Sequence, residues 1–140
     1  MELQQKTKTD TNGLIPPYGG KLKNLIITDK NLKNDLISKS TYEFECSERN
    51  ACDVELLMVG AFSPLEGFMD ENNYNSVIKN NRNTNGLLFG LPIVFDSNNE
   101  KVKVGETILL SYKKRKIAVL EVSSKMGAWQ ILRSWTVLWY

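Results

Sequence analysis

The chain of 140 residues contains no histidine, which limits the chemistry that its side chains can perform. Histidine is the usual general acid or base near neutral pH and the commonest ligand of transition metals. Ser-His-Asp and Cys-His hydrolases and His-ligated zinc or iron sites are therefore excluded for this sequence. The chemical groups that remain are two cysteines, several carboxylates, a pair of glycines and a run of cations.

The two cysteines, Cys46 and Cys52, lie six positions apart. This spacing fits neither a Cys-x-x-Cys redox pair nor a zinc knuckle, and no pattern of adjacent cations marks either thiolate as reactive. A disulfide is sterically conceivable, but residues 1–12 are polar and form no signal peptide. No stretch approaches the roughly 18 apolar residues that cross a membrane. We therefore expect reduced, structural thiols in a cytoplasmic protein.

The carboxylates occur as two close pairs, Glu43 with Glu45 and Asp53 with Glu55. Without a histidine partner or a cleft, both pairs are better explained as solvated faces of a strand and a helix. The adjacent glycines Gly19 and Gly20 lack the spacing of a phosphate-binding loop and precede no helix start. They are predicted to adopt positive φ in a turn. No catalytic, cofactor-binding or metal-binding residue is predicted.

Four consecutive cations stand out against a net charge of only +2: Lys113, Lys114, Arg115 and Lys116. Such a run could contact phosphate, and RNA binding is one interpretation. The run has no interleaved aromatic residues on which bases would stack, and acidic residues balance it elsewhere. A solvated turn is the interpretation we adopt, and no nucleic-acid partner is expected.

Hydrophobic spacing and capping residues predict three helices, over residues 29–39, 48–59 and 71–80. Caps are expected at Asp29 or Thr28, at Ser47 and at Asp70, and Gly60 should end the second helix. The second helix would bury one face, made by Ala51, Val54, Leu57 and Met58. The third helix would turn Tyr74, Val77 and Ile78 inward. Residues 1–12 are rich in Gln, Lys and Thr, and we expect them to be a disordered lead-in.

Period-two patterns predict strands over residues 42–45, 107–112 and 116–122, the last two joined as a hairpin across residues 113–115. A short strand over 22–27 is also compatible with the pattern. Residues 87–95 contain Pro92, which favours an edge or bent strand. Helices early in the chain followed by a small antiparallel sheet or partial barrel indicate the α+β class.

The C-terminal residues 126–140 differ from the rest of the chain. They hold all three tryptophans, Trp129, Trp135 and Trp139, and none of the sixteen acidic residues. One interpretation is an aromatic strand that packs on the sheet. The other is a shifted reading frame after Lys125, because one permitted back-translation, read with one nucleotide removed, yields Trp-Glu-Pro-Gly-Lys and further polar residues. We expect a non-native, frameshifted tail.

Five segments taken in order, residues 14–22, 52–57, 60–69, 85–94 and 118–122, carry a resemblance to a known family. They resemble the amino-terminal domain of ATP sulfurylase (sulfate adenylyltransferase) of cyanobacterial type, over residues 13–125. The resemblance implies a PUA-like β pseudo-barrel with flanking helices. In that family the stretch after the position of Lys125 reads Trp-Glu-Pro-x-Lys, which the shifted frame recovers.

The family joins ATP and sulfate to give adenosine 5′-phosphosulfate and pyrophosphate. Its catalytic groups lie in a following domain, in a Gln-x-Arg-Asn-Pro segment and in histidine motifs, and this sequence contains neither. The resemblance therefore implies a non-catalytic structural domain or fragment that binds no cofactor itself, ATP being a substrate of the full-length enzyme. It also implies the catalytic domain as a partner and a homo-oligomer in the full-length enzyme. A free-standing RNA-binding module and an accessory subunit are the alternatives.

Two positions within the resemblance invite specific expectations. Tyr18 replaces the histidine of the family's Pro-His-Gly-Gly, and we expect it to pack at a turn. The loop before Asp70 carries apolar residues that should be buried, either within the domain or against the catalytic domain. The residues of this expected interface are Phe62, Ser63, Pro64, Leu65, Gly67, Phe68 and Met69.

Overall fold

The computed structural model describes residues 13–96 and 101–126, together with the backbone of residues 133–135. The elements follow the order α1 (Lys30–Lys39), β1 (Tyr42–Glu45), α2 (Glu48–Met58), α3 (Glu71–Asn80), β2 (Thr107–Tyr112), β3 (Arg115–Glu121) and β4 (Arg133–Trp135). The predicted α+β class and the three predicted helices are confirmed. The longest described helix, α2, has 11 residues, and no helix in the described part of the chain could span a bilayer.

Each helix begins at a predicted cap. The side chain of Asp29 accepts hydrogen bonds from the backbone N–H groups of two residues in α1, Ser47 accepts one from Asn50, and Asp70 accepts one from Asn73. These bonds satisfy donors that a helix start leaves unpaired. Ser47 and Asp70 also precede acidic first-turn residues, which the positive end of a helix favours.

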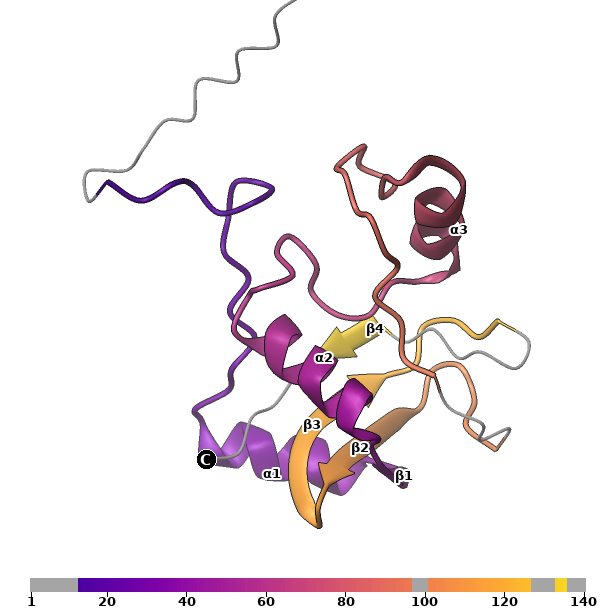
Figure 1. Cartoon of the computed structure of the whole chain (residues 1–140). Helices are drawn as coiled ribbons and strands as arrows, with labels where there is room; N and C mark the ends of the chain where they lie inside the picture. The colour runs from indigo at the N-terminus through magenta and orange to yellow at the C-terminus, as the bar shows by residue number, and fades with distance from the viewer. Residues whose placement is uncertain (1–12, 97–100, 127–132, 136–140) are drawn as a thin grey trace, which may run out of the picture.

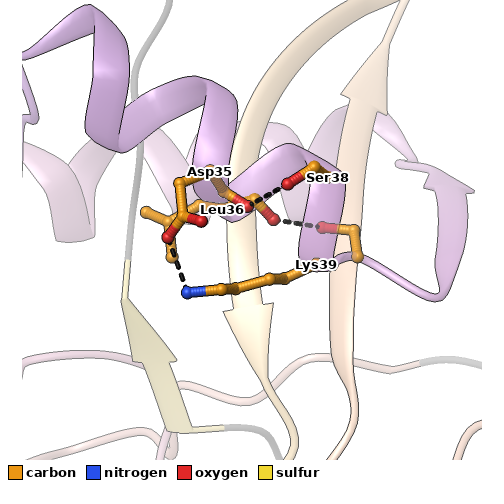
Figure 2. A network of polar contacts seen from close by, with 5 residues as sticks. Asp35, Leu36, Ser38 and Lys39 are labelled. Carbon is orange, nitrogen blue, oxygen red and sulfur yellow. Dashed lines mark hydrogen bonds and ion pairs between the residues drawn. The ribbon is translucent and has the colours of Figure 1, made fainter.

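The C-terminal half of α1 is held by local polar contacts (Figure 2). Lys39 Nζ lies 2.6 Å from Asp35 Oδ2, one turn earlier. Ser38 Oγ donates a hydrogen bond of 2.7 Å to the carbonyl of Asp35, and Ser40 Oγ donates one of 3.0 Å to the carbonyl of Leu36. None of the residues of α1 is fully buried, so these contacts support a helix whose packing on the sheet is light.

The sheet has the order β1-β2-β3-β4 (Figure 1). The predicted hairpin of β2 and β3 is confirmed, but its turn has two residues and Arg115 already belongs to β3. The expectation of a purely antiparallel sheet is wrong for β1, which runs parallel to β2. Parallel neighbours need a long connection, and the chain between β1 and β2, which includes α2 and α3, provides it.

Both faces of the sheet are covered. Residues of α2, including Val54, Leu57 and Met58, pack with Ile108 and Leu110 of β2 in the main core. Phe95 joins this core, where its ring makes an edge contact with Phe44 and a tilted contact with Phe68. On the other face Leu109 and Val119 contact partly buried residues of α1 and the segment before it, Ile27, Leu36 and Ile37. Burial on both faces explains why β2 is almost continuously apolar.

Two predicted strands are absent from the described structure. Residues 22–27 are irregular, because Asn24 Oδ1 accepts a hydrogen bond from the backbone of Ile26 and favours a local turn. Residues 87–95 make only an isolated bridge between Leu88 and Arg82. Pro92 removes a backbone donor from this segment, and the carbonyl of Ile93 accepts from Met69 rather than from a neighbouring strand.

The tail contributes backbone to the sheet. Residues Arg133–Trp135 pair antiparallel with β3, in register with Glu121, Leu120 and Val119. For these three residues the pairing agrees with the first of the two interpretations of the tail, a C-terminal strand on the sheet. Residues 127–132 and 136–140 lie outside the described part of the chain, as does the predicted lead-in of residues 1–12. The shifted reading frame after Lys125 stays a prediction.

Candidate functional site

Three segments far apart in the sequence meet at one end of the molecule. They are an N-terminal arm (residues 13–27), the loop of residues 61–70 between α2 and α3, and the segment of residues 81–93 that follows α3 (Figure 1). A cleft of about 570 Å³ lies between them. Its lining includes Gly19, Lys21 and Lys23 of the arm, residues 64–70 of the loop, Asn73 of α3, and Asn83, Thr84 and Asn85. Three of the five segments with the family resemblance, residues 14–22, 60–69 and 85–94, thus contribute to the lining of this cleft.

Ser63 connects the arm to the end of α2. Its hydroxyl accepts a hydrogen bond of 2.9 Å from the backbone N–H of Lys23 and donates one of 2.6 Å to the carbonyl of Gly60. Two residues further along the arm, the N–H of Leu25 donates a hydrogen bond of 2.9 Å to the carbonyl of Met58. Ser63 is buried, and its bond to Gly60 is shielded from water. Together with the bonds from Lys23 and Leu25, it fixes the arm on α2.

Two glycines permit close approach at this junction. Gly19 has a φ of 76°, and a Cβ atom there would lie 2.8 Å from the ring of Pro64. Gly60 ends α2 with a φ of 83° in a Schellman arrangement: its N–H donates to Leu57, and the N–H of Ala61 donates to Leu56. The predicted roles of Gly19 in a turn and of Gly60 as a helix stop are confirmed.

Tyr18 links the arm to the segment after α3. Its hydroxyl donates a hydrogen bond of 2.9 Å to the carbonyl of Leu88, and its ring meets the edge of Phe89 at 6.1 Å between centroids. Tyr18 belongs to the turn in which the N–H of Gly20 donates to the carbonyl of Pro17. The side chain therefore packs at a turn, as expected, and its polar atom is used for structure.

The polar residues of the cleft are mostly engaged with one another. Asn73 Oδ1 accepts from the N–H and the hydroxyl of Thr84, both at 3.0 Å, while Asn73 Nδ2 donates to Asp70 at 2.9 Å. The buried Asn83 accepts from the backbone of Asn85 and Leu87. The ammonium of Lys23 pairs with Glu66. These contacts shape the loops around the cleft and leave few groups for a ligand.

The residues of the expected interface loop differ in how deeply they are buried. Ser63, Gly67, Phe68 and Met69 are buried, and Phe68 packs in the main core. Phe62, Pro64 and Leu65 are only partly buried. The second half of the loop therefore packs inside the domain itself. The role of the loop as an interface stays a prediction, and it now concerns Phe62, Pro64 and Leu65.

Large apolar side chains that the sequence analysis did not single out are exposed on two of these segments, the arm and the segment after α3. On the arm they are Leu14, Ile15 and Leu22, and after α3 they are Leu88 and Leu91. Ile15 is 75% exposed and Leu91 is 73% exposed. We call these five residues the apolar strip. The signal that could have found them is proline: Pro16 and Pro92 follow Ile15 and Leu91, where no helix or inner strand can form to bury them.

A second hollow of about 780 Å³ lies between β1 and the start of α2, lined by residues that include Cys46, Asn50 and Asp96. Burial, and secondarily the carboxylate of Glu45, raise the pKa of Cys46 to about 12. Its thiol is therefore protonated near neutral pH and is a poor nucleophile. Cys46 and the exposed Cys52 are both free thiols. In the described residues no three Cys, Asp or Glu side chains gather as metal ligands would.

Comparison with known proteins identifies the chain's relatives. Residues 15–132 match the family described as PUA-like domain. A sulfate adenylyltransferase of Neurospora crassa is 40% identical over 116 residues, which cover 76% of this chain and 20% of that protein. One of Debaryomyces hansenii is 41% identical over 109 residues, covering 67% of this chain and 21% of that protein. The chain therefore spans about a fifth of the length of these curated relatives.

A solved structure supports the same assignment. The hexameric APS kinase from Thiobacillus denitrificans superposes with a TM-score of 0.74 at 31% sequence identity, over 86% of this chain and 26% of that one. The fold expected from the resemblance is thus confirmed by both sequence and structure. The chain belongs to the PUA-like domain family, and the part that matches is shared with sulfate adenylyltransferases.

Proposed function

We propose that this chain is the amino-terminal, non-catalytic part of a sulfate adenylyltransferase, an enzyme that joins ATP and sulfate to give adenosine 5′-phosphosulfate and pyrophosphate. The observation that carries the proposal is the 40% identity to relatives of that name over a fifth of their length. The two free cysteines fit a reducing compartment, such as the cytoplasm, in which this reaction would take place.

The chemistry of the described side chains is consistent with a structural, non-catalytic role. Adenylyl transfer needs several cations and donors placed around a crowded phosphate. At the cleft, Lys23 is paired with Glu66 and the amides of Asn73 and Asn83 hold the loops. The four cations of residues 113–116 lie at the other end of the molecule (Figure 1). The reacting groups would therefore come from another part of the enzyme.

The apolar strip is the surface that would dock on that other part. Several large apolar side chains exposed on adjoining segments are typical of an interaction site in a soluble protein. The main chain next to Leu22 and at Leu88 is held by the bonds of Ser63 and Tyr18, so these two positions would need little ordering on docking. Phe62, Pro64 and Leu65 of the expected interface would complete this surface.

An exchange experiment tests the proposal. The matched 116 residues of the Neurospora crassa protein would be replaced by this chain, and pyrophosphate release with ATP and sulfate would be measured. The chain alone should release no pyrophosphate above buffer, whereas the chimera should retain activity within about tenfold of the unmodified relative. The same relative with these residues deleted is the control and should be inactive.

Activity of the isolated chain would overturn the non-catalytic assignment. A folded but inactive chimera would instead show that the chain does not provide what this part of the relative provides. In the second case the accessory-subunit and RNA-binding alternatives would return.

A further inference from the structure

A tight turn in the segment after α3 presents the dipeptide Asn85-Gly86 to solvent. The N–H of Gly86 donates a hydrogen bond of 2.9 Å to the carbonyl of Asn83, and the N–H of Asn83 donates one of 2.9 Å to the carbonyl of Leu87. Gly86 has a φ of 82°. This arrangement is typical of a hairpin turn whose last residue lies in the left-handed region, where glycine is preferred.

The side-chain amide of Asn85 is not used in the fold. It makes no hydrogen bond to another described residue, whereas the backbone N–H of Asn85 donates to Asn83 Oδ1 at 3.1 Å. The neighbouring asparagines differ: Asn83 is 4% exposed and its Oδ1 accepts two backbone N–H groups, while the amide of Asn73 bonds Thr84 and Asp70. Of these three amides, that of Asn85 is the one free to react.

Glycine after asparagine favours a particular reaction of that amide. The backbone nitrogen of the following residue attacks the side-chain carbonyl carbon and closes a five-membered ring, and asparagine is thermolabile for this reason. A side chain on the following residue hinders the attack, and glycine has none. Nothing lies within 4 Å of the position that a Cβ atom would take at Gly86, so the approach is also open to other parts of the fold.

We propose that Asn85 is a site of spontaneous covalent modification, at which the side-chain amide is lost through a cyclic imide formed with Gly86. The nitrogen of Gly86 gives up its proton and bonds to Cγ of Asn85, the bond from Cγ to Nδ2 breaks, and ammonia leaves. Water then opens the ring. Addition of water at Cγ gives aspartate, and addition at the main-chain carbonyl carbon of Asn85 gives isoaspartate, in which the main chain runs through Cγ.

The hydrogen bond of Gly86 controls the rate of ring closure. Its N–H must leave the carbonyl of Asn83 before the nitrogen can bond to Cγ, so the ring closes from an opened turn. Opening also breaks the exposed bond from Arg82 to the carbonyl of Gly86. Exposed backbone bonds in loops are among those that open most readily. The reaction should therefore be slower than in the unfolded chain, but faster than at the buried Asn83.

The two products have different consequences for the structure. Aspartate keeps the length of the main chain and adds one negative charge to the cleft, which Lys21 also lines. Isoaspartate lengthens the main chain by one atom, so Gly86 no longer lies in register with Asn83. Leu88 follows directly, and its carbonyl accepts the hydrogen bond from Tyr18. Isoaspartate should therefore loosen the link between the arm and this segment, whatever the chain binds.

Peptide mapping of the full chain, incubated under mildly alkaline conditions, tests the proposal. Asn83 and Asn85 lie on the same tryptic peptide, which begins after Arg82, so fragment masses compare the two in one measurement. A zero-time sample corrects for reaction during digestion. Loss of the amide should be at least tenfold faster at Asn85 than at Asn83, and faster again in urea. Absence of both products at Asn85, or equal rates at the two asparagines, would overturn the proposal.

Variants test the ring mechanism. Asn85→Gln would need a six-membered ring, so its amide should persist, and it should melt like the wild type because this side chain makes no bond in the fold. Gly86→Ala hinders the attack and should slow the reaction at least tenfold in urea, where the backbone strain of the folded turn does not contribute. Loss of the amide from either variant at the rate of the wild type would refute ring closure by Gly86.

Amide exchange gives a structural readout. Modified chains are separated by ion exchange, because each has lost one positive unit of net charge. The isoaspartate form should exchange the N–H groups of Asn83 and Phe89 faster than the wild type, since both donate across the turn. The variant Asn85→Asp is the matched control, with the added charge and a main chain of normal length, and should exchange like the wild type. Equal exchange in the isoaspartate form and in Asn85→Asp would contradict the predicted opening of the turn.

Discussion

The contact between the end of α2 and the arm makes a quantitative prediction for Gly60→Ala. A residue with a Cβ atom at a φ of 83° pays about 1–2 kcal/mol for the left-handed conformation. The added Cβ would also lie 2.8 Å from Leu22 Cδ1 and 3.0 Å from the carbonyl oxygen of Lys23. The leucine side chain can rotate away, but the backbone oxygen can move only with the arm, which costs about 1 kcal/mol more.

The resulting loss of about 2–3 kcal/mol can be read by thermal unfolding. For a chain of 140 residues, 1 kcal/mol corresponds to about 3–4 °C in melting temperature. Gly60→Ala should therefore melt about 6–12 °C below the wild type. Amide exchange should also quicken at Leu25, whose N–H donates to Met58 across the same contact.

Gly86→Ala provides the matched control. Gly86 has a φ of 82°, but nothing lies within 4 Å of the Cβ atom that alanine would add. Gly86→Ala should lose only the conformational part, about 3–8 °C in melting temperature, with no change in exchange at Leu25. If both variants lose the same stability, the arm does not pack on Gly60 as described, and the reasoning fails.

Three further predictions concern stability. Burial and the carboxylate of Glu45 raise the pKa of Cys46 from 9.0 to about 12, which stabilises the folded state below pH 9 and is lost as pH rises towards 12. The free energy of unfolding measured in urea should therefore fall more steeply above pH 9 for the wild type than for Cys46→Ala. Burial raises the pKa of Asp53 above 3.8, with the charge of Arg49 opposing the shift and that of Asp96 adding to it, so the charged carboxylate destabilises the folded state. Asp53→Asn should therefore raise the melting temperature at neutral pH but not below pH 3.8. Lys113 and Lys114 have φ values of 49° and 63°, so Lys113→Asn/Lys114→Gly should gain about 1 kcal/mol by relieving the turn, and an unchanged or lower melting temperature would show that the turn is not strained.

The sequence predicted best those features that depend on local patterns. The caps Asp29, Ser47 and Asp70 and the buried face of α2 follow from spacing alone, and all are confirmed. Ile78, predicted to face inward, is 60% exposed, because α3 buries only Val77. The helical period sets which side chains share a face, but the width of the buried face depends on what packs against it.

Features that depend on long-range pairing could not be predicted. The parallel pairing of β1 with β2 joins residues more than sixty positions apart, and nothing in the residues 42–45 specifies a neighbour. The cleft depends equally on such contacts, since Ser63 and Tyr18 select partners in distant segments. The family resemblance indicated which segments matter, but not that they converge.

The central claim is that this chain docks, through its apolar strip, on the remainder of a sulfate adenylyltransferase. The most direct test is calorimetric titration of the chain into the Neurospora crassa relative from which the matched 116 residues have been removed. We predict saturable one-to-one binding that Leu91→Asp weakens at least tenfold, and that Lys113→Asn/Lys114→Gly leaves unchanged. Absence of binding by a folded chain, or equal binding by Leu91→Asp, would contradict this account.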